Sequence, residues 1–152
     1  MPLQTLCIVH TDASILLGLK KRGLGAGRWN GFGGTVHDGE NVKTAAIREV
    51  HEETLITVED LVEVGMLEFD LEDRGLHLEV YVFSARTFTG APTETDEMRP
   101  LWFSLDQIPY SEMWPDDPFW LPLLLQGKRF TGRVRLRDPN TMIECIVTAI
   151  MP

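Results

Sequence analysis

Three acidic side chains, Glu49, Glu52 and Glu53, lie within five residues of one another. In a helix each residue advances about 100°, so these spacings place the three carboxylates within roughly a 100° arc of one face. The adjoining face carries Ala46 and Val50 and is apolar. One side of such a helix can pack against a sheet while its edge presents three carboxylates.

This arrangement breaks two local rules of helix stability. Like charges three and four residues apart oppose each other by a few tenths of a kcal/mol per pair, and the C-terminal end of a helix is already its negative pole. A divalent cation would remove the repulsion, and magnesium prefers oxygen ligands. His51 points away from the carboxylates, which argues against zinc, whereas Arg48 can orient Glu52. Spacing alone leaves open a second interpretation, an acidic face that is only solvated.

The elements around the glutamates can be placed from the sequence. Asn41 is a suitable N-cap for a helix that runs from about Val42 to Thr54. The preceding stretch KKRGLGAGRWNGFGG is rich in glycine, which indicates tight turns and close approach of the backbone to another group. It contains neither the dinucleotide fingerprint nor the P-loop motif. The glutamates therefore lie near the end of a capped helix that follows a glycine-rich loop.

Strands account for most of the remaining chain. We expect them at Leu3–His10, Ile15–Leu19, Leu61–Phe69, Leu76–Phe88, Arg99–Phe103, Phe130–Arg137 and Met142–Thr148. Hairpin turns are expected at 11–13 and 138–140. A second helix should follow a turn-rich segment, with Asp117 as its cap and Pro118 in its first turn. The pattern predicts one α/β domain over 1–152, with a mixed sheet and at least two helices.

Length, charge and cysteine content limit the classes of function. The 152 residues suit one domain, and 23 acidic against 14 basic residues give a net charge of −9. A protein that coats nucleic acid should be basic, so a nucleic acid polymer is a disfavoured partner. No apolar run suggests a membrane span or a signal peptide. Cys7 and Cys145 lack metal-site spacing, which favours a reducing, cytoplasmic location, and a monomer is the default expectation.

The glutamate segment also resembles a known family motif. Gly34 is followed after five residues by Glu40, and after seven more by the hexapeptide REVHEE (48–53), with Ile56 two residues beyond Thr54. This pattern is similar to the Nudix box, here 34–56, at every charged position. The glycine that follows the glutamates in the box is Leu55 here. Because a glycine there ends the helix with positive φ, leucine must accept that conformation at a cost of about 1 kcal/mol, or the helix must end differently.

The resemblance to Nudix hydrolases implies an α/β/α sandwich with a central mixed β-sheet. It also implies hydrolysis of a nucleoside diphosphate linked to another moiety, with magnesium or manganese as the cofactor. The implied metal ligands are the side chains of Glu49, Glu52, Glu53 and Glu97 and the carbonyl of Gly33. The metal would cancel phosphate charge, lower the pKa of a bound water and hold the leaving pyrophosphate. Glu53 is the first candidate for the base or for the ligand of that water, and Glu52 is the next.

Segments outside the box narrow the resemblance. LLGLKKRGLGAGRWNGFGG, TDEMRP and QIPYSEMWPDDPFWLPLLLQGKRF are together similar to the vertebrate oxidised purine nucleoside triphosphatases, and the likeness runs from Leu3 to about Phe130. In that family the matching residues read the base edge (Asn30, Asp116, Asp117), stack on the base (Trp114) or line the substrate pocket (Thr5, Lys20, Phe32, Gly33, Gly34, Thr35, Phe69, Pro115). Two departures, Leu24 for phenylalanine and Thr35 for lysine, affect the expected pocket wall and phosphate contacts.

The chemistry of these residue types agrees with a purine site. A purine gains roughly 1–3 kcal/mol by stacking on a flat side chain such as Trp114, and the Asn30 amide offers both a donor and an acceptor. Two adjacent carboxyls, Asp116 and Asp117, disfavour double ionisation when partly buried, which raises the pKa of one of them. Moving one proton between them would fit the pocket to either oxidised guanine or oxidised adenine. Simpler roles stay open, namely a helix cap for Asp117, core packing for Trp114 and Phe69, and a turn for Asn30.

We therefore expect a magnesium-dependent pyrophosphohydrolase of oxidised purine nucleoside triphosphates, such as 8-oxo-dGTP and 2-hydroxy-dATP. Its products would be the nucleoside monophosphate and pyrophosphate, and its role would be to cleanse the nucleotide pool. One alternative is a Nudix hydrolase of another nucleotide, such as a dinucleoside polyphosphate or a methylated purine triphosphate. A second is a nucleotide-binding Nudix domain without catalysis, which should lack Glu52 or Glu53, and both residues are present.

Overall fold

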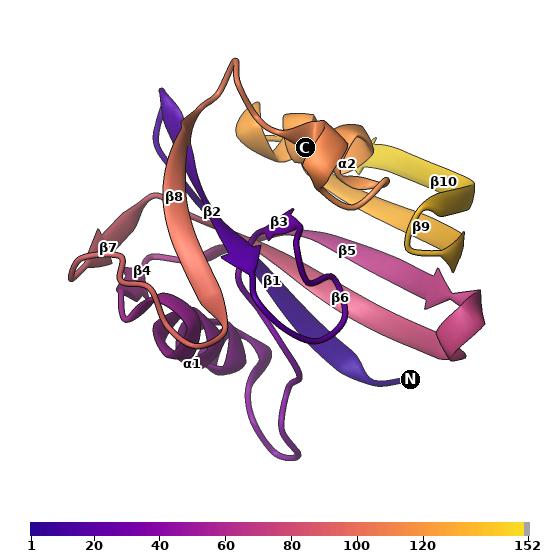
Figure 1. Ribbon diagram of the computed structural model, residues 1–152, viewed down its shortest axis with the longest axis horizontal. Helices are drawn as coiled ribbons and strands as arrows, with labels where there is room; N and C mark the ends of the chain where they lie inside the picture. The colour runs from indigo at the N-terminus through magenta and orange to yellow at the C-terminus, as the bar shows by residue number, and fades with distance from the viewer. Residues whose placement is uncertain (151–152) are drawn as a thin grey trace.

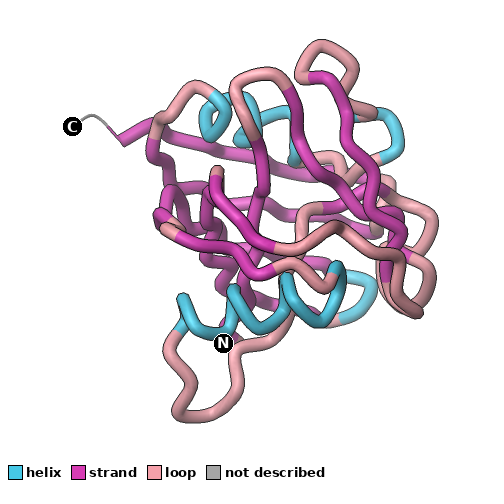
Figure 2. Tube along the Cα trace, turned by 90° about the vertical axis from the view of Figure 1, so that its left-hand side faces the viewer, coloured by secondary structure: helices cyan, strands magenta, loops and turns pink. Residues whose placement is uncertain are grey.

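A mixed sheet forms the centre of the molecule in the computed structural model, which describes residues 1–150. Its strands follow the spatial order β10-β9-β5-β6-β1-β2-β3, and β8 also pairs with β2. Their bounds are β1 Leu3–His10, β2 Ser14–Lys20, β3 Trp29–Asn30, β5 Val62–Leu71, β6 Leu76–Ala85, β8 Met98–Ser104, β9 Arg129–Asp138 and β10 Thr141–Ile150. The helices α1 (Val42–Thr54) and α2 (Asp117–Leu125) lie on opposite sides of this sheet (Figure 1 and Figure 2). The predicted α/β/α sandwich is therefore confirmed.

Parallel and antiparallel pairs alternate through the sheet. β1 pairs in parallel with β6, and β5 pairs in parallel with β9. The hairpins β1–β2, β5–β6 and β9–β10 are antiparallel. The N-terminal strand therefore lies inside the sheet between β6 and β2, where both of its edges can be hydrogen-bonded.

The structure corrects several strand boundaries. The strand expected over Leu76–Phe88 ends at Ala85, and the residues beyond it form β7 (Thr87–Thr89), which pairs with β4 (Thr57–Glu59) in a separate two-stranded sheet. Neither β4 nor the two-residue β3 was expected. Two short 3₁₀ turns, η1 (Glu72–Arg74) and η2 (Tyr110–Glu112), complete the elements. Such short elements are stabilised by distant partners rather than by their own sequence.

Helix α1 begins and ends where the sequence predicts. The Asn41 side chain caps it by accepting hydrogen bonds from the backbone N–H groups of Lys43 and Thr44, at 2.9 and 3.4 Å. The helix ends in Leu55, which has φ 67° and so occupies the left-handed region. Of the two possibilities open for this leucine, the strained one is therefore the one observed. The side chain of Leu55 is 48 % exposed, so little packing compensates the strain.

Two apolar cores cover the two faces of the sheet. Successive residues of β1 point to opposite faces, so Cys7 packs with Val50 of α1 on one face, whereas Ile8 packs with Trp120 of α2 on the other. The Trp120 ring stacks on Phe130 of β9, with ring centroids 5.8 Å apart. Each helix is therefore fixed to the sheet by its own core.

Helix α2 starts one residue earlier than the sequence suggested. Asp116 occupies the N-cap position and Asp117 is the first helical residue, so the prediction of Asp117 as the cap was wrong. The Asp116 side chain makes no capping hydrogen bond. Its Oδ2 accepts a bond from Trp120 Nε1 at 2.9 Å instead. Both carboxyls therefore remain available to the cavity beside the helix.

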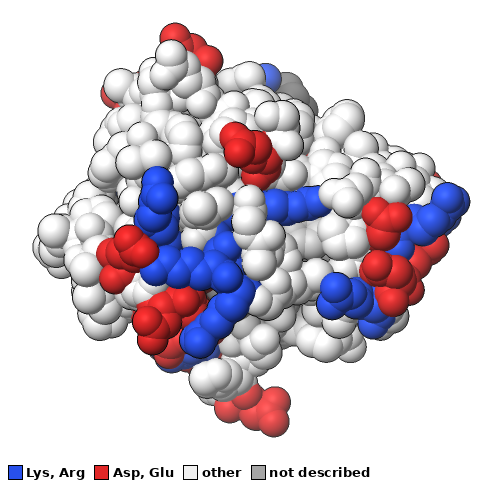
Figure 3. All heavy atoms as spheres, viewed as in Figure 1, with Lys and Arg blue, Asp and Glu red and all other residues white. Residues whose placement is uncertain are grey.

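The surface carries small groups of basic and acidic side chains next to one another on the face in Figure 3. Ion pairs on the surface include Arg133–Glu68, at 3.4 Å, and Arg22–Glu97, at 3.6 Å. Within residues 1–150, neither helix is long and apolar enough to cross a bilayer.

Candidate active site

The three glutamates of α1 differ in how far they are buried. The Glu53 residue is only 4 % exposed, whereas the side chain of Glu49 is 14 % exposed and that of Glu52 is 54 % exposed. Glu53 Oε1 accepts a hydrogen bond from the backbone N–H of Gly33 at 2.8 Å. The helix therefore presents a graded set of carboxylates, from one fixed in the interior to one in solvent.

The glycine pair before the helix allows the loop to approach these carboxylates. A Cβ atom on Gly33 would lie 1.8 Å from the carbonyl oxygen of Thr5 in β1, and a Cβ on Gly34 would lie 2.5 Å from the carboxyl carbon of Glu49. A side chain at Gly33 would collide with the backbone of β1, and one at Gly34 would displace the Glu49 carboxylate. The glycine-rich stretch predicted that the backbone approaches another group closely. In the structure this loop approaches β1 at Gly33 and α1 at Gly34.

Arg48 connects the acidic residues of the motif. Its Nε donates to Glu40 Oε2 at 2.8 Å, and its Nη1 lies 3.0 Å from Glu49 Oε1 and 3.2 Å from Glu52 Oε1. Its Nη2 donates to the carbonyl oxygen of Thr35 at 3.0 Å. The hydrogen bond from Arg48, followed by one from the His37 backbone, lowers the pKa of Glu40 to about 2. Arg48 therefore fixes Glu49 and Glu52 relative to the loop.

Burial makes the glutamate edge electrostatically unfavourable. Loss of hydration raises the pKa of Glu53 to about 8, and the negative charges of Glu49 and Glu97 add to this shift, while the Gly33 N–H opposes it. Burial also raises the pKa of Glu49. Burial therefore disfavours the ionised form of both carboxyls, and a cation would oppose this effect.

The donor chemistry of this edge suits a hard cation. Carboxylate oxygens from one helix and the loop that packs against them are the ligand type that magnesium and calcium prefer. As the side chains lie, no three acidic, histidine or cysteine residues within 1–150 converge into a complete cage. Ligation by Glu49, Glu52 and Glu53 would therefore require them to turn from Arg48 and Gly33 toward a shared ion.

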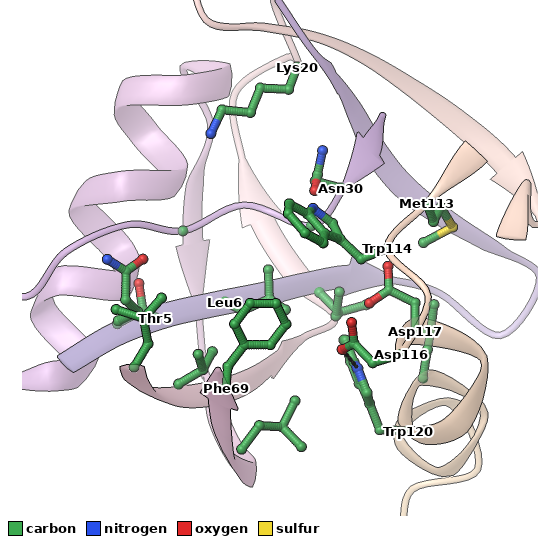
Figure 4. A pocket seen from close by; sticks show the side chains of 18 of the residues that line it. Thr5, Leu6, Lys20, Asn30, Phe69, Met113, Trp114, Asp116, Asp117 and Trp120 are labelled. Carbon is green, nitrogen blue, oxygen red and sulfur yellow. Dashed lines mark hydrogen bonds between the residues drawn. The ribbon is translucent and has the colours of Figure 1, made fainter. Parts of the chain in front are cut away.

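A cavity of about 220 Å³ opens beside this edge, on the sheet face that carries α2 (Figure 4). It brings together nine of the predicted site residues, namely Thr5, Lys20, Asn30, Gly33, Glu53, Phe69, Trp114, Asp116 and Asp117. They come from β1, β2, β3, the loop after β3, α1, β5, the segment before α2 and the first residue of α2. The inner end of the glutamate edge and the expected base-binding residues therefore line one continuous space.

The base end of the cavity is aromatic and acidic. Trp114 meets Phe69 edge to face with ring centroids 5.8 Å apart. Asp116 and Asp117 are 4 % and 7 % exposed, and burial raises the pKa of both; the charge of Asp116 raises that of Asp117 further. The Asn30 Nδ2 donates to the carbonyl oxygen of Arg28 at 2.8 Å. This bond leaves Asn30 Oδ1 and one N–H available to a ligand.

Several predicted site residues lie outside this cavity. The prediction that the Phe32 side chain lines it was wrong, since that ring is fully buried in the core between the sheet and α1. Gly34 packs on Glu49, and exposed Thr35 accepts a hydrogen bond from Gln4 Nε2 at 3.0 Å. Pro115 lines a neighbouring hollow, and Glu97 is exposed.

Some lining residues were not identified from the sequence. Leu6, Val80 and Met113 line the cavity, and Leu6 lies close to Phe69 in Figure 4. Ile8 lies two residues after Leu6 on the same face of β1, so the alternation of that strand was the signal that could have found both. Met113 follows a short 3₁₀ turn and carries no comparable signal.

Comparison with known proteins decides the family. The NUDIX domain model matches residues 2–124. The chain belongs to the Nudix hydrolases. Members of this family generally use divalent metal ions. The box at 34–56 thus accounts for the glutamate edge as a family feature rather than as an acidic face that is only solvated.

Individual Nudix relatives agree with this assignment. The chain is 48 % identical over 142 residues to the oxidized purine nucleoside triphosphate hydrolase of Mus musculus, covering 93 % of this chain and 91 % of that protein. It is 46 % identical to the Danio rerio protein of the same name, with the same coverage. The mutator MutT protein of Bacillus halodurans matches the fold with a TM-score of 0.85 at 24 % identity, covering 97 % of both chains.

Proposed function

We propose that this protein hydrolyses oxidised purine nucleoside triphosphates, including 8-oxo-dGTP and 2-hydroxy-dATP, to the nucleoside monophosphate and pyrophosphate. The observation that carries the proposal is the single cavity in which Trp114 and two buried aspartates share a wall with Gly33 and Glu53. The names of the mouse and zebrafish relatives support the same substrate class. The role would be to remove damaged nucleotides before polymerases use them.

Magnesium is the proposed cofactor, with manganese as a substitute. Glu49, Glu52 and Glu53 would hold it, together with the carbonyl of Gly33 and the Glu97 carboxylate. When bound, the metal would neutralise phosphate charge, lower the pKa of a bound water and hold the leaving pyrophosphate. The position of Glu53 supports this assignment, because a buried carboxylate with a raised pKa is stabilised in its ionised form by a nearby cation.

The protein groups have separate tasks in this proposal. Water attacks an inner phosphorus, and Glu53 is the first candidate to accept its proton, with Glu52 as the second. Lys20 lines the same cavity, and its positive charge acts on Glu53, so it can also pair with the anionic phosphates. One chain supplies every group named, which supports a monomer.

The base would stack on one side chain and be read by hydrogen bonds. Trp114 supplies the stacking surface, and Asn30 and the aspartates supply donors and acceptors. Because both aspartates have a raised pKa, one carboxyl can be protonated and donate while the other accepts. Exchange of that proton would let the pocket accept either oxidised guanine or oxidised adenine.

A cytoplasmic location is part of the proposal and is supported by the unpaired thiols of Cys7 and Cys145.

The Asp117→Asn variant tests this exchange of a proton. Its amide keeps the shape of the side chain but fixes the donor and acceptor, so we expect kcat/KM to fall by about 100-fold for one oxidised purine and by less than tenfold for the other. Steady-state kinetics on 8-oxo-dGTP and 2-hydroxy-dATP give the two ratios. Equal losses on both substrates would show that the pair does not exchange a proton.

The proposed activity is tested by pyrophosphate release across a nucleotide panel with and without magnesium. We expect fastest turnover of oxidised purine triphosphates and no turnover in excess chelator. Preference for dinucleoside polyphosphates or for methylated purine triphosphates would instead identify a Nudix hydrolase of another nucleotide. Binding without turnover of any panel member would identify a non-catalytic Nudix domain.

A further inference from the structure

Arg28 contacts two residues of the base site, Asn30 and Trp114, and also the turn between β9 and β10. It belongs to the glycine-rich turn between β2 and β3, and its carbonyl oxygen accepts the hydrogen bond from Asn30. Its guanidinium carbon lies 4.9 Å from the centroid of the Trp114 ring. Its Nη2 donates to Oδ1 of Asn140, in the turn between β9 and β10. Its Nη1 is buried and has no hydrogen-bond partner.

Arg28 lies against the Trp114 ring but does not line the base cavity. Arg28 lines the neighbouring hollow with Pro139 and Asn140, whereas Trp114 lines the base cavity. The backbone of Gly25 also lies close to the indole, because a Cβ atom on Gly25 would be 3.1 Å from it. The φ angle of Gly25, +84°, likewise favours glycine at this position. The indole therefore contacts a cation that lies outside the cavity, while the indole itself lines the cavity.

A cation in this position has two physical effects. A guanidinium over an aromatic face is attracted to it by about 0.5–2 kcal/mol, more when water is excluded, so it restrains the tilt of the indole. Burial raises the pKa of both Asp116 and Asp117, and the positive charge of Arg28 acts in the opposite direction on both. The other titratable groups that act on the pair are Tyr110, which faces Asp117, and Cys145, which faces Asp116.

We propose that Arg28 is a positioning residue for the purine site, which completes a three-layer stack of guanidinium, indole and base. This role rests on the proposed function. Arg28 contacts no reacting atom and acts through Trp114, through its backbone bond to Asn30 and through its charge on the acidic pair. It links the β9–β10 turn, through Asn140, to the wall on which the base is placed.

The test compares Arg28→Met and Arg28→Lys with a matched control, Arg86→Met, which removes an exposed arginine paired with Asp12. Arg28→Met keeps a long, unbranched side chain but removes the positive charge and the planar guanidinium group. We expect it to raise KM for 8-oxo-dGTP by about tenfold while kcat stays within about twofold. The pH profile of kcat/KM should shift toward higher pH, because the acidic pair loses a nearby positive charge.

The remaining variants separate charge from stacking. Arg28→Lys should restore the pH profile and recover only part of the KM effect, since lysine keeps the charge without the planar fork. Arg86→Met should match the wild type in both. Should Arg28→Met fail to fold by circular dichroism, Asn140→Ala, which frees the guanidinium, should raise KM in the same direction.

Three results would overturn the inference. Unchanged KM and pH profile in Arg28→Met, beside an active wild-type protein, would refute the role of Arg28 and leave the proposed function intact. An unchanged KM in Asn140→Ala would do the same if the first variant does not fold. Absence of turnover of any oxidised purine triphosphate by the wild-type protein would overturn the proposed function and this inference together.

Discussion

At the scale of single residues, Glu53 shows a conflict between stability and chemistry. Its carboxyl is buried, hydrogen-bonded by the Gly33 N–H and raised in pKa to about 8. Since the unfolded pKa is 4.5, the stability that the protonated carboxyl contributes is complete below pH 4.5 and is lost as the pH rises through about 8. At neutral pH the metal-free protein therefore carries an unfavourable proton or charge at this position.

Substitution of Glu53 by glutamine should separate the two properties. We expect kcat to fall at least about 100-fold, because a proton acceptor or metal ligand is lost. In the presence of EDTA at pH 7, the free energy of unfolding should rise by about 1–3 kcal/mol, because no charge is buried. Urea denaturation of both proteins measures this difference.

Glu52→Gln provides the comparison for that experiment. The Glu52 side chain is 54 % exposed, so its neutralisation should leave the stability in EDTA nearly unchanged. Equal stability of Glu53→Gln and wild type in EDTA would mean that the Glu53 charge is solvated in the native state, contrary to its burial.

At the scale of elements, features set by neighbouring residues could be predicted from the sequence, whereas features set by pairing with distant segments could not. The bounds of α1 follow from the Asn41 cap and the helical periodicity of the motif, which act within a few residues. The short strands β3, β4 and β7 exist only because each pairs with a distant segment, so their sequences could not indicate them. The direction of the Phe32 side chain depends on the bridge to Cys7 of β1, which placed the ring in the core instead of the pocket.

The candidate site divides in the same way. The Nudix box, the LLGLKKRGLGAGRWNGFGG segment and the WPDDPFW segment contain seven of the nine predicted residues that line the cavity, because these segments are contiguous and chemically specific. The contributions of Leu6, Val80 and Arg28 arise from the packing of β1, β6 and the β2–β3 turn. Apolar strand positions are common to all cores, so the sequence could not distinguish those that border a cavity.

Replacing Leu55 by glycine should stabilise the end of α1. Leu55 has φ 67°, a conformation that costs a non-glycine residue about 1 kcal/mol, and glycine relieves it while adding entropy to the unfolded chain. We expect a net gain of about 0.5–1 kcal/mol in the free energy of unfolding, measured by urea denaturation. Leu55→Ala removes the same side chain but keeps the Cβ, so it should show no gain; equal stabilisation by both would assign the effect to the exposed side chain.

At the scale of the whole molecule, the site depends on both faces of the sheet. The glutamates belong to the helix on one face, whereas the base end of the cavity lies beside the helix on the other. Gly33 connects them, since it contacts Thr5 of β1, donates to Glu53 and lines the cavity. Loss of either core should therefore impair activity as well as stability.

A buried histidine should make global stability sensitive to mild acid. His10 is 3 % exposed, and its Nε2 lies 2.7 Å from Ser84 Oγ, which joins β1 to β6. Burial lowers its pKa below the ordinary value of 6.5, so the stability it contributes is present above pH 6.5 and is lost as the pH falls through the native pKa. Between pH 7 and pH 5, His10→Gln should lose less unfolding free energy than wild type.

His51→Gln is the control for this measurement, because His51 is exposed on α1. Its stability should fall with pH as steeply as that of the wild type. A His10→Gln variant with the wild-type slope would show that His10 is already hydrated in the native state.

The position of β1 also has a consequence for biosynthesis. Leu3–His10 is synthesised before Leu76–Ala85, with which it pairs in the finished protein, so it waits for residue 85 before its parallel neighbour exists. During that interval the nascent chain exposes an apolar strand with an open edge, which is the kind of surface that chaperones bind and that aggregates. A ribosome stalled before residue 85 should therefore hold a chain that is sensitive to protease, and one stalled well beyond it should hold a chain whose first strand is protected.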